Sequence, residues 1–124
     1  MVTYKIVQPH HLNPNENLFG GALMSWMDEI CAMHAWTYTE KNCVTRKVGE
    51  IEFKKPAVCG DRIKLQTEVV REGRTSIGIK VRVSRTNFEV KDESIAEAEF
   101  FFVAIDSQGR KVQWHTGKTD ADEE

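Results

Sequence analysis

The spacing of apolar positions changes once along the chain, and this change separates a helical part from a β-rich part. From about residue 18 to residue 36, apolar side chains cover most of the circumference of a helix; they are Leu23, Met24, Trp26, Met27, Ile30, Cys31, Met33 and Trp36. A helix that is apolar nearly all round is typical of a buried element. We therefore expect one long core helix that begins near residues 18–21.

Beyond Cys43 the apolar positions alternate, which predicts β-strands. One short strand is expected ahead of the helix at residues 3–8, and the later strands are expected at residues 44–53, 63–69, 77–83 and 95–106. The alternation changes phase at Gly49, which predicts a bulge or bend in the first of these later strands. The last strand is apolar on both faces, so we expect it to be a central strand or to be covered on both sides.

These elements predict an α+β fold in which one helix packs on an antiparallel sheet. One helix covers only one face of such a sheet, so at least a dimer is expected to cover the other. Residues 1–113 are expected to form a single domain. The polar, acidic residues 114–124 are expected to be a disordered tail.

Composition excludes few functions. The 124 residues carry a formal net charge of −2 and show no basic stripe that would suit nucleic acid. No apolar run is long enough to span a membrane, and the N-terminus lacks the pattern of a secretory signal. Cys31, Cys43 and Cys59 have neither zinc-site spacing nor a disulfide pattern. We therefore expect a cytoplasmic protein that requires no metal and binds neither nucleic acid nor membrane.

Two neighbouring acids, Asp28 and Glu29, interrupt the apolar helix. At 100° per residue, Asp28 shares its face with Met24 and Cys31, whereas Glu29 has the polar Ser25 one turn away. A buried carboxylate costs several kcal/mol unless it has partners, is protonated or faces a cavity. Asp28 is therefore a candidate catalytic acid, although a solvated or ion-paired acid would give the same pattern.

The pair Gly20–Gly21 stands where the helix is expected to begin. A helix N-terminus offers free N–H groups that can bind an anion or stabilise an oxyanion, and glycine lets a ligand approach the backbone closely. Asp28 lies roughly two turns, about 10–12 Å, farther along the helix axis, too far to share one carbonyl easily with these amides. A site formed between two copies of the chain is therefore expected.

Four segments resemble the hotdog-fold acyl-CoA thioesterases in order and spacing. They are NPNENLFGGALMSWMDEICAMHA, VTRKVGEIEFKKPAVCGD, REGRTSIGIKVRV and AEFFFVAIDSQGR. The resemblance covers about residues 4–112 and implies a helix wrapped by a curved antiparallel sheet, paired as a double hotdog dimer and often assembled as a trimer of dimers. It also implies hydrolysis of a fatty acyl-CoA to free acid and CoA, with CoA as part of the substrate and no other cofactor.

The resemblance implies particular site residues. Asn17 and Asp28, from opposite subunits, correspond to the functional asparagine and the catalytic acid, and we expect the Gly20 and Gly21 amides to face the thioester carbonyl. The family binds CoA with the strand that ends in F-x-K-P and with a G-R-[ST]-S hairpin; here these residues are Phe53, Lys54, Lys55, Pro56, Arg74, Thr75 and Ser76. Glu16 replaces a glycine found in many relatives, which leaves the substrate range open.

Two other functions fit parts of the pattern. A hotdog hydratase would pair a histidine with the acid, but His34 lies six residues past Asp28 on the opposite side of the helix, and His10 and His11 lie in the preceding loop. A non-catalytic acyl-CoA sensor or carrier would keep the CoA groove and dispense with the acid. Asp28 itself could act as a general base or as a nucleophile.

Overall fold

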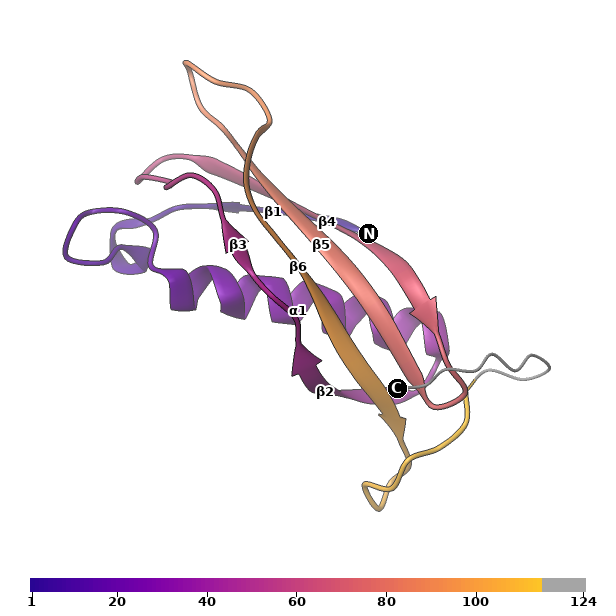
Figure 1. The fold of residues 1–124 in the computed structure, drawn as a ribbon. Helices are drawn as coiled ribbons and strands as arrows, with labels where there is room; N and C mark the ends of the chain where they lie inside the picture. The colour runs from indigo at the N-terminus through magenta and orange to yellow at the C-terminus, as the bar shows by residue number, and fades with distance from the viewer. Residues whose placement is uncertain (115–124) are drawn as a thin grey trace.

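A computed structural model, which describes residues 1–114, shows one long helix against an antiparallel sheet (Figure 1). The elements in chain order are β1 (Val2–Ile6), the 3₁₀ turn η1 (Pro9–His11), α1 (Gly20–Thr39), β2 (Asn42–Val48), β3 (Glu52–Phe53), β4 (Arg62–Glu72), β5 (Ser76–Thr86) and β6 (Glu93–Ile105). The expected order of strand, helix and antiparallel strands is confirmed. Apart from its first residue, the predicted tail lies outside the described residues.

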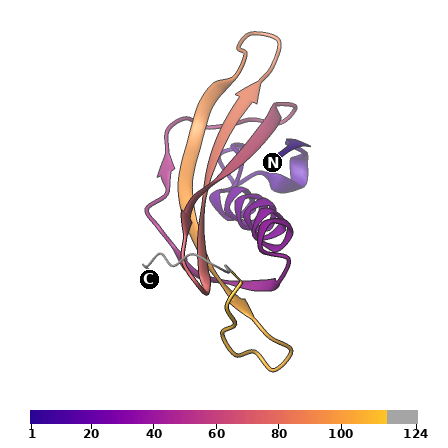
Figure 2. The ribbon, with the colours of Figure 1, turned by 90° about the vertical axis from the view of Figure 1, so that its right-hand side faces the viewer.

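The sheet has the strand order β1-β4-β5-β6-β2, and β3 also pairs with β6. The strand β6 therefore lies inside the sheet, one of the two arrangements that its apolar faces predicted. The sheet curves around α1, which contacts β2, β4, β5 and β6 and is seen nearly end-on in Figure 2. This is the helix-in-sheet arrangement expected of a hotdog domain.

The single strand predicted at residues 44–53 is divided into β2 and β3, both paired with β6. The division falls at Gly49, as the change of phase indicated. Its N–H donates a hydrogen bond to the Glu99 carbonyl at 2.8 Å, and a Cβ at this position would lie 3.3 Å from the same oxygen. The register also shifts between Thr45 and Lys47 within β2. The phase change therefore marked a real break in the edge strand.

Alternate side chains of the central strands form the core with one face of α1. The buried strand residues include Ile77, Ile79, Val81, Val83, Ala96, Ala98, Phe100 and Phe102. The helix buries Trp26 and Met27, but Met33 and Trp36 remain 47% and 50% exposed. The prediction of a helix buried all round is therefore wrong for the single chain, because the sheet covers only one of its sides.

Candidate active site

The loop that leads into α1 is anchored to two other segments by backbone hydrogen bonds. The Phe19 N–H donates to the His11 carbonyl at 2.8 Å, and the Leu18 N–H donates to the Ala57 carbonyl at 2.8 Å. The first bond closes the loop on η1, and the second joins it to the segment that follows β3. The start of α1 is thereby fixed against the predicted F-x-K-P segment.

Inside this loop, Asn13 is the organising side chain. Its Oδ1 accepts hydrogen bonds from the backbone N–H groups of Asn15, at 2.9 Å, and Asn17, at 3.1 Å. Asparagine commonly stabilises turns by bonding backbone groups two or more residues ahead. Because its oxygen is occupied in this way, the Asn13 side chain has a fixed orientation and its amide NH₂ group remains available as a donor.

Gly20 and Gly21 are the first residues of α1, and Phe19 is the N-cap residue without a side-chain cap. The first N–H groups of a helix have no intrahelical acceptor. Among residues 1–114 no other acceptor bonds the N–H groups of Gly20 or Gly21. A Cβ on Gly21 would lie 2.6 Å from the Phe19 ring. A Cβ on Gly20 would have more space, with its nearest neighbour in the Phe53 ring at 3.9 Å. The helix start therefore presents unoccupied donors.

A cavity of about 320 Å³ lies beside the helix start. The residues that line it are Asn13, Asn17, Leu18, Gly20, Leu23, Phe53, Lys54, Lys55, Pro56, Ala57 and Ile95. It therefore brings the predicted catalytic residues Asn17 and Gly20 together with all four predicted residues of the F-x-K-P segment. Lys54 and Lys55 make only loose ion pairs there, with Glu97 at 3.6 Å and Glu93 at 3.7 Å.

Asp28 lies elsewhere, half-buried on the face of α1 that approaches β2. Its Oδ1 accepts a hydrogen bond from the Thr45 hydroxyl at 2.7 Å, and no ion pair involves Asp28 among the described residues. Burial, together with the Asp28 charge, raises the pKa of the neighbouring Cys31 thiol, which stays protonated. Asp28 is eight residues past Gly20, about 12 Å along the axis, so one chain alone does not bring the acid to the helix start.

Arg74, Thr75 and Ser76 lie at the other end of the sheet from the cavity. Ser76 pairs with Val103 of β6, whereas Phe53 pairs with Ala96. Seven residues of extended strand separate these two pairs, a distance of about 23 Å. Within one chain, the two predicted CoA-binding segments are therefore not brought together.

His11 and His34 contact other residues than Asp28. His34 Nδ1 lies 2.7 Å from the Thr67 hydroxyl, and burial together with the N-terminal ammonium lowers its pKa. His11 packs edge-on against Trp26, with ring centroids 4.9 Å apart. Among residues 1–114, no histidine therefore hydrogen-bonds to Asp28 to form the histidine–acid pair that a hydratase would need.

Asn13 is the site residue that the sequence analysis missed. The Asn13–Pro14 pair gave a signal for a turn, but the three asparagines of the loop could not be ranked without the hydrogen bonds. In the described part of the chain, no group of three His, Cys, Asp or Glu side chains is placed to bind a metal ion. Within residues 1–114, α1 does not have the length and apolar character of a membrane span.

Comparison with known proteins gives consistent matches. The family model of the thioesterase superfamily matches residues 15–90. The uncharacterized acyl-CoA thioester hydrolase YkhA of Bacillus subtilis is 32% identical over 107 residues, which cover 86% of this chain and 62% of that protein. The acyl-CoA thioester hydrolase YciA of Escherichia coli is 32% identical over 116 residues, which cover 89% of this chain and 86% of YciA.

Solved structures match over nearly the whole chain. A hexameric thioesterase from Yersinia pestis has a TM-score of 0.87 and 30% identity, and the match covers 93% of this chain and 94% of that one. An acyl-CoA hydrolase from Staphylococcus aureus, in complex with butyryl-CoA, CoA and CoA disulfide, has a TM-score of 0.88 and 27% identity, with 98% and 75% covered. A further match, from Campylobacter jejuni, is a hexameric hotdog-fold thioesterase. The chain has the hotdog fold and belongs to the thioesterase superfamily.

Proposed function

We propose that this protein hydrolyses the thioester bond of acyl-CoA and releases a free carboxylic acid and CoA. One observation carries the proposal: one cavity is lined both by Gly20, the first residue of α1, and by the F-x-K-P segment, whereas Gly21 is not among its lining residues. The superfamily match and the relatives named acyl-CoA thioester hydrolases support the same reaction. The free cysteines fit the reducing cytoplasm, where we place the reaction.

The start of α1 would stabilise the transition state. As water attacks the thioester carbon, the carbonyl oxygen becomes negatively charged. The Gly20 and Gly21 N–H groups are fixed donors at the positive end of the helix dipole, so they can bind this oxyanion without rearrangement. The breaking C–S bond then releases CoA as the thiol after the sulfur receives a proton.

Asp28 would supply the acid–base function from a second copy of the chain. It could remove a proton from the attacking water or attack the carbonyl itself to form an anhydride that water then hydrolyses. The Thr45 hydroxyl would hold the carboxylate in position through its 2.7 Å hydrogen bond. The separation of about 12 Å from Gly20 within one chain supports a double hotdog dimer as the catalytic unit. The hexameric relatives support further assembly as a trimer of dimers.

Two asparagines are candidates for orienting the water or the thioester carbonyl. Asn17 lines the cavity, but so does Asn13. The S. aureus hydrolase has been studied as an asparagine-to-alanine variant with bound CoA and as an aspartate-to-alanine variant, and these two positions are fifteen residues apart. In this chain, the asparagine fifteen residues before Asp28 is Asn13, whereas Asn17 is eleven residues before it. This spacing and the fixed orientation of its side chain favour Asn13.

The two predicted CoA-binding segments would contribute to the same site only if they come from different copies of the chain. Lys54 and Lys55 lie at the cavity in loose, solvent-accessible ion pairs that phosphate groups could replace. Phe53 and Pro56 provide apolar wall for the pantetheine arm. Arg74, Thr75 and Ser76, about 23 Å away in the same chain, would reach the nucleotide end of CoA from a neighbouring copy.

The test replaces Asp28 with Asn and measures thiol release from butyryl-CoA and a series of longer acyl-CoAs. Loss of a general base predicts a fall in kcat of about a hundredfold or more. Glu29→Gln is the matched control, because Glu29 is the adjacent acid on the same helix, with its side chain 64% exposed. It should leave kcat within a small factor of the original value.

Circular dichroism and gel filtration would verify that both variants keep their fold and assembly. Near-normal turnover of Asp28→Asn would refute the role of the acid. Tight binding of acyl-CoA by the unmodified protein without thiol release would instead identify a sensor or carrier.

A further inference from the structure

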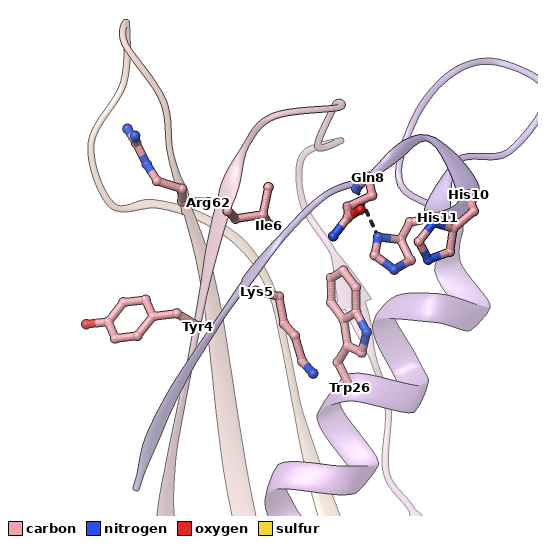
Figure 3. Close-up of a pocket in the computed structure, with 8 residues that line it drawn as sticks. All are labelled: Tyr4, Lys5, Ile6, Gln8, His10, His11, Trp26 and Arg62. Carbon is pink, nitrogen blue, oxygen red and sulfur yellow. Dashed lines mark hydrogen bonds between the residues drawn. The ribbon is translucent and has the colours of Figure 1, made fainter.

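A second and larger cavity, of about 700 Å³, lies between β1 and α1. Its lining residues are labelled in Figure 3; they are Tyr4, Lys5, Ile6, Gln8, His10, His11, Trp26 and Arg62. The volume falls in the range of about 300–1,000 Å³ that is usual for sites of small organic ligands. None of the residues proposed above for thioester hydrolysis lines this cavity.

The cavity lies on the flank of α1 opposite the catalytic acid. Trp26 forms part of its wall. Asp28 is two positions after Trp26, so the two side chains point in directions about 200° apart around the helix axis. Asp28 faces Thr45 of β2, whereas the cavity lies at the other edge of the sheet, where β1 is the terminal strand. A molecule in this cavity would therefore lie on the opposite flank of α1 from the Asp28 carboxylate of the same chain.

The polar groups on the helix side of β1 are hydrogen-bond donors. Lys5 extends toward Trp26, with its Nζ 5.9 Å from the ring centroid, and His11 lies above the same ring (Figure 3). The Gln8 N–H donates to His11 Nδ1 at 3.0 Å, so neutral His11 carries its hydrogen on Nε2. Burial, followed by the charges of His10 and Lys5, lowers the pKa of His11, which keeps this neutral form at pH 7.

Trp26 forms part of the cavity wall. It is only 9% exposed, yet its indole N–H has no hydrogen-bond partner among residues 1–114. Buried indole N–H groups usually have an acceptor. No Asp or Glu lines the cavity, and the nearest acid, Glu29, lies 3.9 Å from Lys5 in a largely exposed pair. The cavity therefore holds the Lys5 ammonium, whose one ion pair is long and largely exposed, and the His11 N–H, with no acidic residue in its own lining.

The remaining lining is mixed: Gln8, His10 and Arg62 are polar, and Tyr4 and Ile6 supply apolar surface. Tyr4 and Ile6 stand on the other face of β1 and are 66% and 57% exposed. They continue the apolar surface of Trp26 around the free edge of the strand. The chemistry that fits both parts is a small amphipathic anion, with an acceptor head at Lys5 and His11 and an apolar body along Ile6 and Tyr4.

We propose that this cavity binds an organic carboxylate with an aliphatic body, the chemical class of the acid that thioester hydrolysis would release. Only the source of the ligand rests on the proposed function, because the donor set and the apolar wall are properties of the cavity itself. A carboxylate fits the helix side of the cavity, because the Lys5 ammonium there supplies one positive charge and neutral His11 adds an N–H donor. The other cation of the lining, Arg62, points away from Lys5 and packs over the Phe88 ring, 5.4 Å from its centroid (Figure 3). Occupancy would let the acid product act on the enzyme away from the reacting thioester.

The test measures binding of octanoate to the full-length protein by calorimetry with saturating CoA present to occupy the thioester site. Octanoate should bind, whereas octylamine, which has the same apolar body and a cationic head, should not. Lys5→Gln should weaken octanoate binding about tenfold, as expected for loss of a charge-assisted hydrogen bond. Lys111→Gln, at an exposed lysine outside the cavity, is the matched control and should bind octanoate like the unmodified protein.

Three results would overturn the proposal: no octanoate binding, equal binding of octanoate and octylamine, or equal behaviour of the two lysine variants. Displacement of octanoate by inorganic phosphate or by ATP at comparable concentrations would also overturn it, since a general anion site or a nucleotide site would then be present. Thiol release from butyryl-CoA is measured separately on each variant. Absence of thiol release would refute the proposed function without affecting the binding result, so the two failures are distinguishable.

Discussion

Asp61 gives the sharpest test of how the fold supports the candidate site. Its side chain is buried, with 1% exposed, in the turn between β3 and β4. Its Oδ2 accepts hydrogen bonds from the Val58 N–H at 2.9 Å and from Arg85 at 3.1 Å, and its Oδ1 accepts one from the Asn87 amide at 2.9 Å. The same turn carries Ala57, which lines the cavity beside the helix start. The hydrogen bonds of Asp61 therefore contribute to the stability of the fold and also hold in place the turn that forms part of that cavity.

Replacing Asp61 with Asn keeps the size of the side chain but turns one acceptor into a donor. If the new NH₂ group takes the Oδ2 position, it meets the donors of both Val58 and Arg85. If it takes the Oδ1 position, it meets the Asn87 NH₂ group. Asn87 cannot simply turn over, because its own oxygen accepts two backbone N–H groups at 2.7 and 2.9 Å. Either orientation leaves buried donors unpaired and removes one of the two carboxylates that pair with Arg85, the other being Glu93 at 2.6 Å.

We expect the free energy of unfolding to fall by about 3 kcal/mol, within the usual cost of breaking a buried ion pair and one buried hydrogen bond. Urea denaturation at fixed protein concentration would measure it, because assembly also contributes to apparent stability. Glu68→Gln is the control: it removes the ion pair with Arg82, in which both side chains are 53% exposed, and should leave stability nearly unchanged. Equal losses in the two variants would refute this account of Asp61.

The pH dependence of the free energy of unfolding gives a second test of the role of Asp61. Burial alone would raise the pKa of Asp61, but the hydrogen bonds from Asn87, Val58 and Arg85 and the Arg85 charge outweigh it and lower the pKa. A lowered folded-state pKa gives stability that is present above the unfolded value of about 4 and is lost as pH falls through the folded value. The stability gap between the original protein and Asp61→Asn should therefore narrow below about pH 4. A constant gap between pH 7 and pH 3 would contradict this linkage.

Two predictions concern the asparagines and the shared site. If Asn13 orients the reacting groups, Asn13→Ala should lower kcat/KM for butyryl-CoA about tenfold or more while Asn17→Ala changes it little; the reverse order would restore Asn17 as the functional residue. Co-expression of Asp28→Asn with Asn13→Ala should recover about one quarter of the original activity, because half of random dimers are mixed and each mixed dimer has one intact site. No recovery would mean that the acid and asparagine act within one chain.

The elements of this fold could be predicted because their sequence signals are local. Alternating residues such as Ile77, Ile79 and Val81 mark one face of a strand whatever its neighbours are, and the change of phase at Gly49 marked the break between β2 and β3. The F-x-K-P segment and the start of α1 were assigned to one site through a family resemblance. The cavity that joins them depends on the pairing of β3 with β6, about forty residues later, which no local pattern reveals.

Asp61 and Asn13 show what the sequence left hidden. Both lie in turns rich in polar residues, where Asp and Asn are usually solvated. Asp61 is buried because Arg85 and Asn87, at the far end of β5, reach it with donors. Asn13 is distinguished from Asn17 by the direction of its hydrogen bonds, since its side chain accepts them from the loop backbone. In both cases the role of the residue depends on its hydrogen-bond partners, and the residue type alone does not identify those partners.

The single chain is structurally complete in its core but chemically incomplete at its candidate site. The donors of Gly20 lie at one end of α1, the Asp28 carboxylate lies about 12 Å farther along, and the predicted hairpin donors lie about 23 Å from Phe53. Around Asp28 the surface is unusually apolar for a solvated face, with Met24 and Val44 38% and 45% exposed. The strand β2 beside it has no strand partner on its outer edge in the described chain. An apolar patch next to an open strand edge and a half-buried acid fits a surface that a second copy covers, and the same contact would place that acid against a neighbouring helix start.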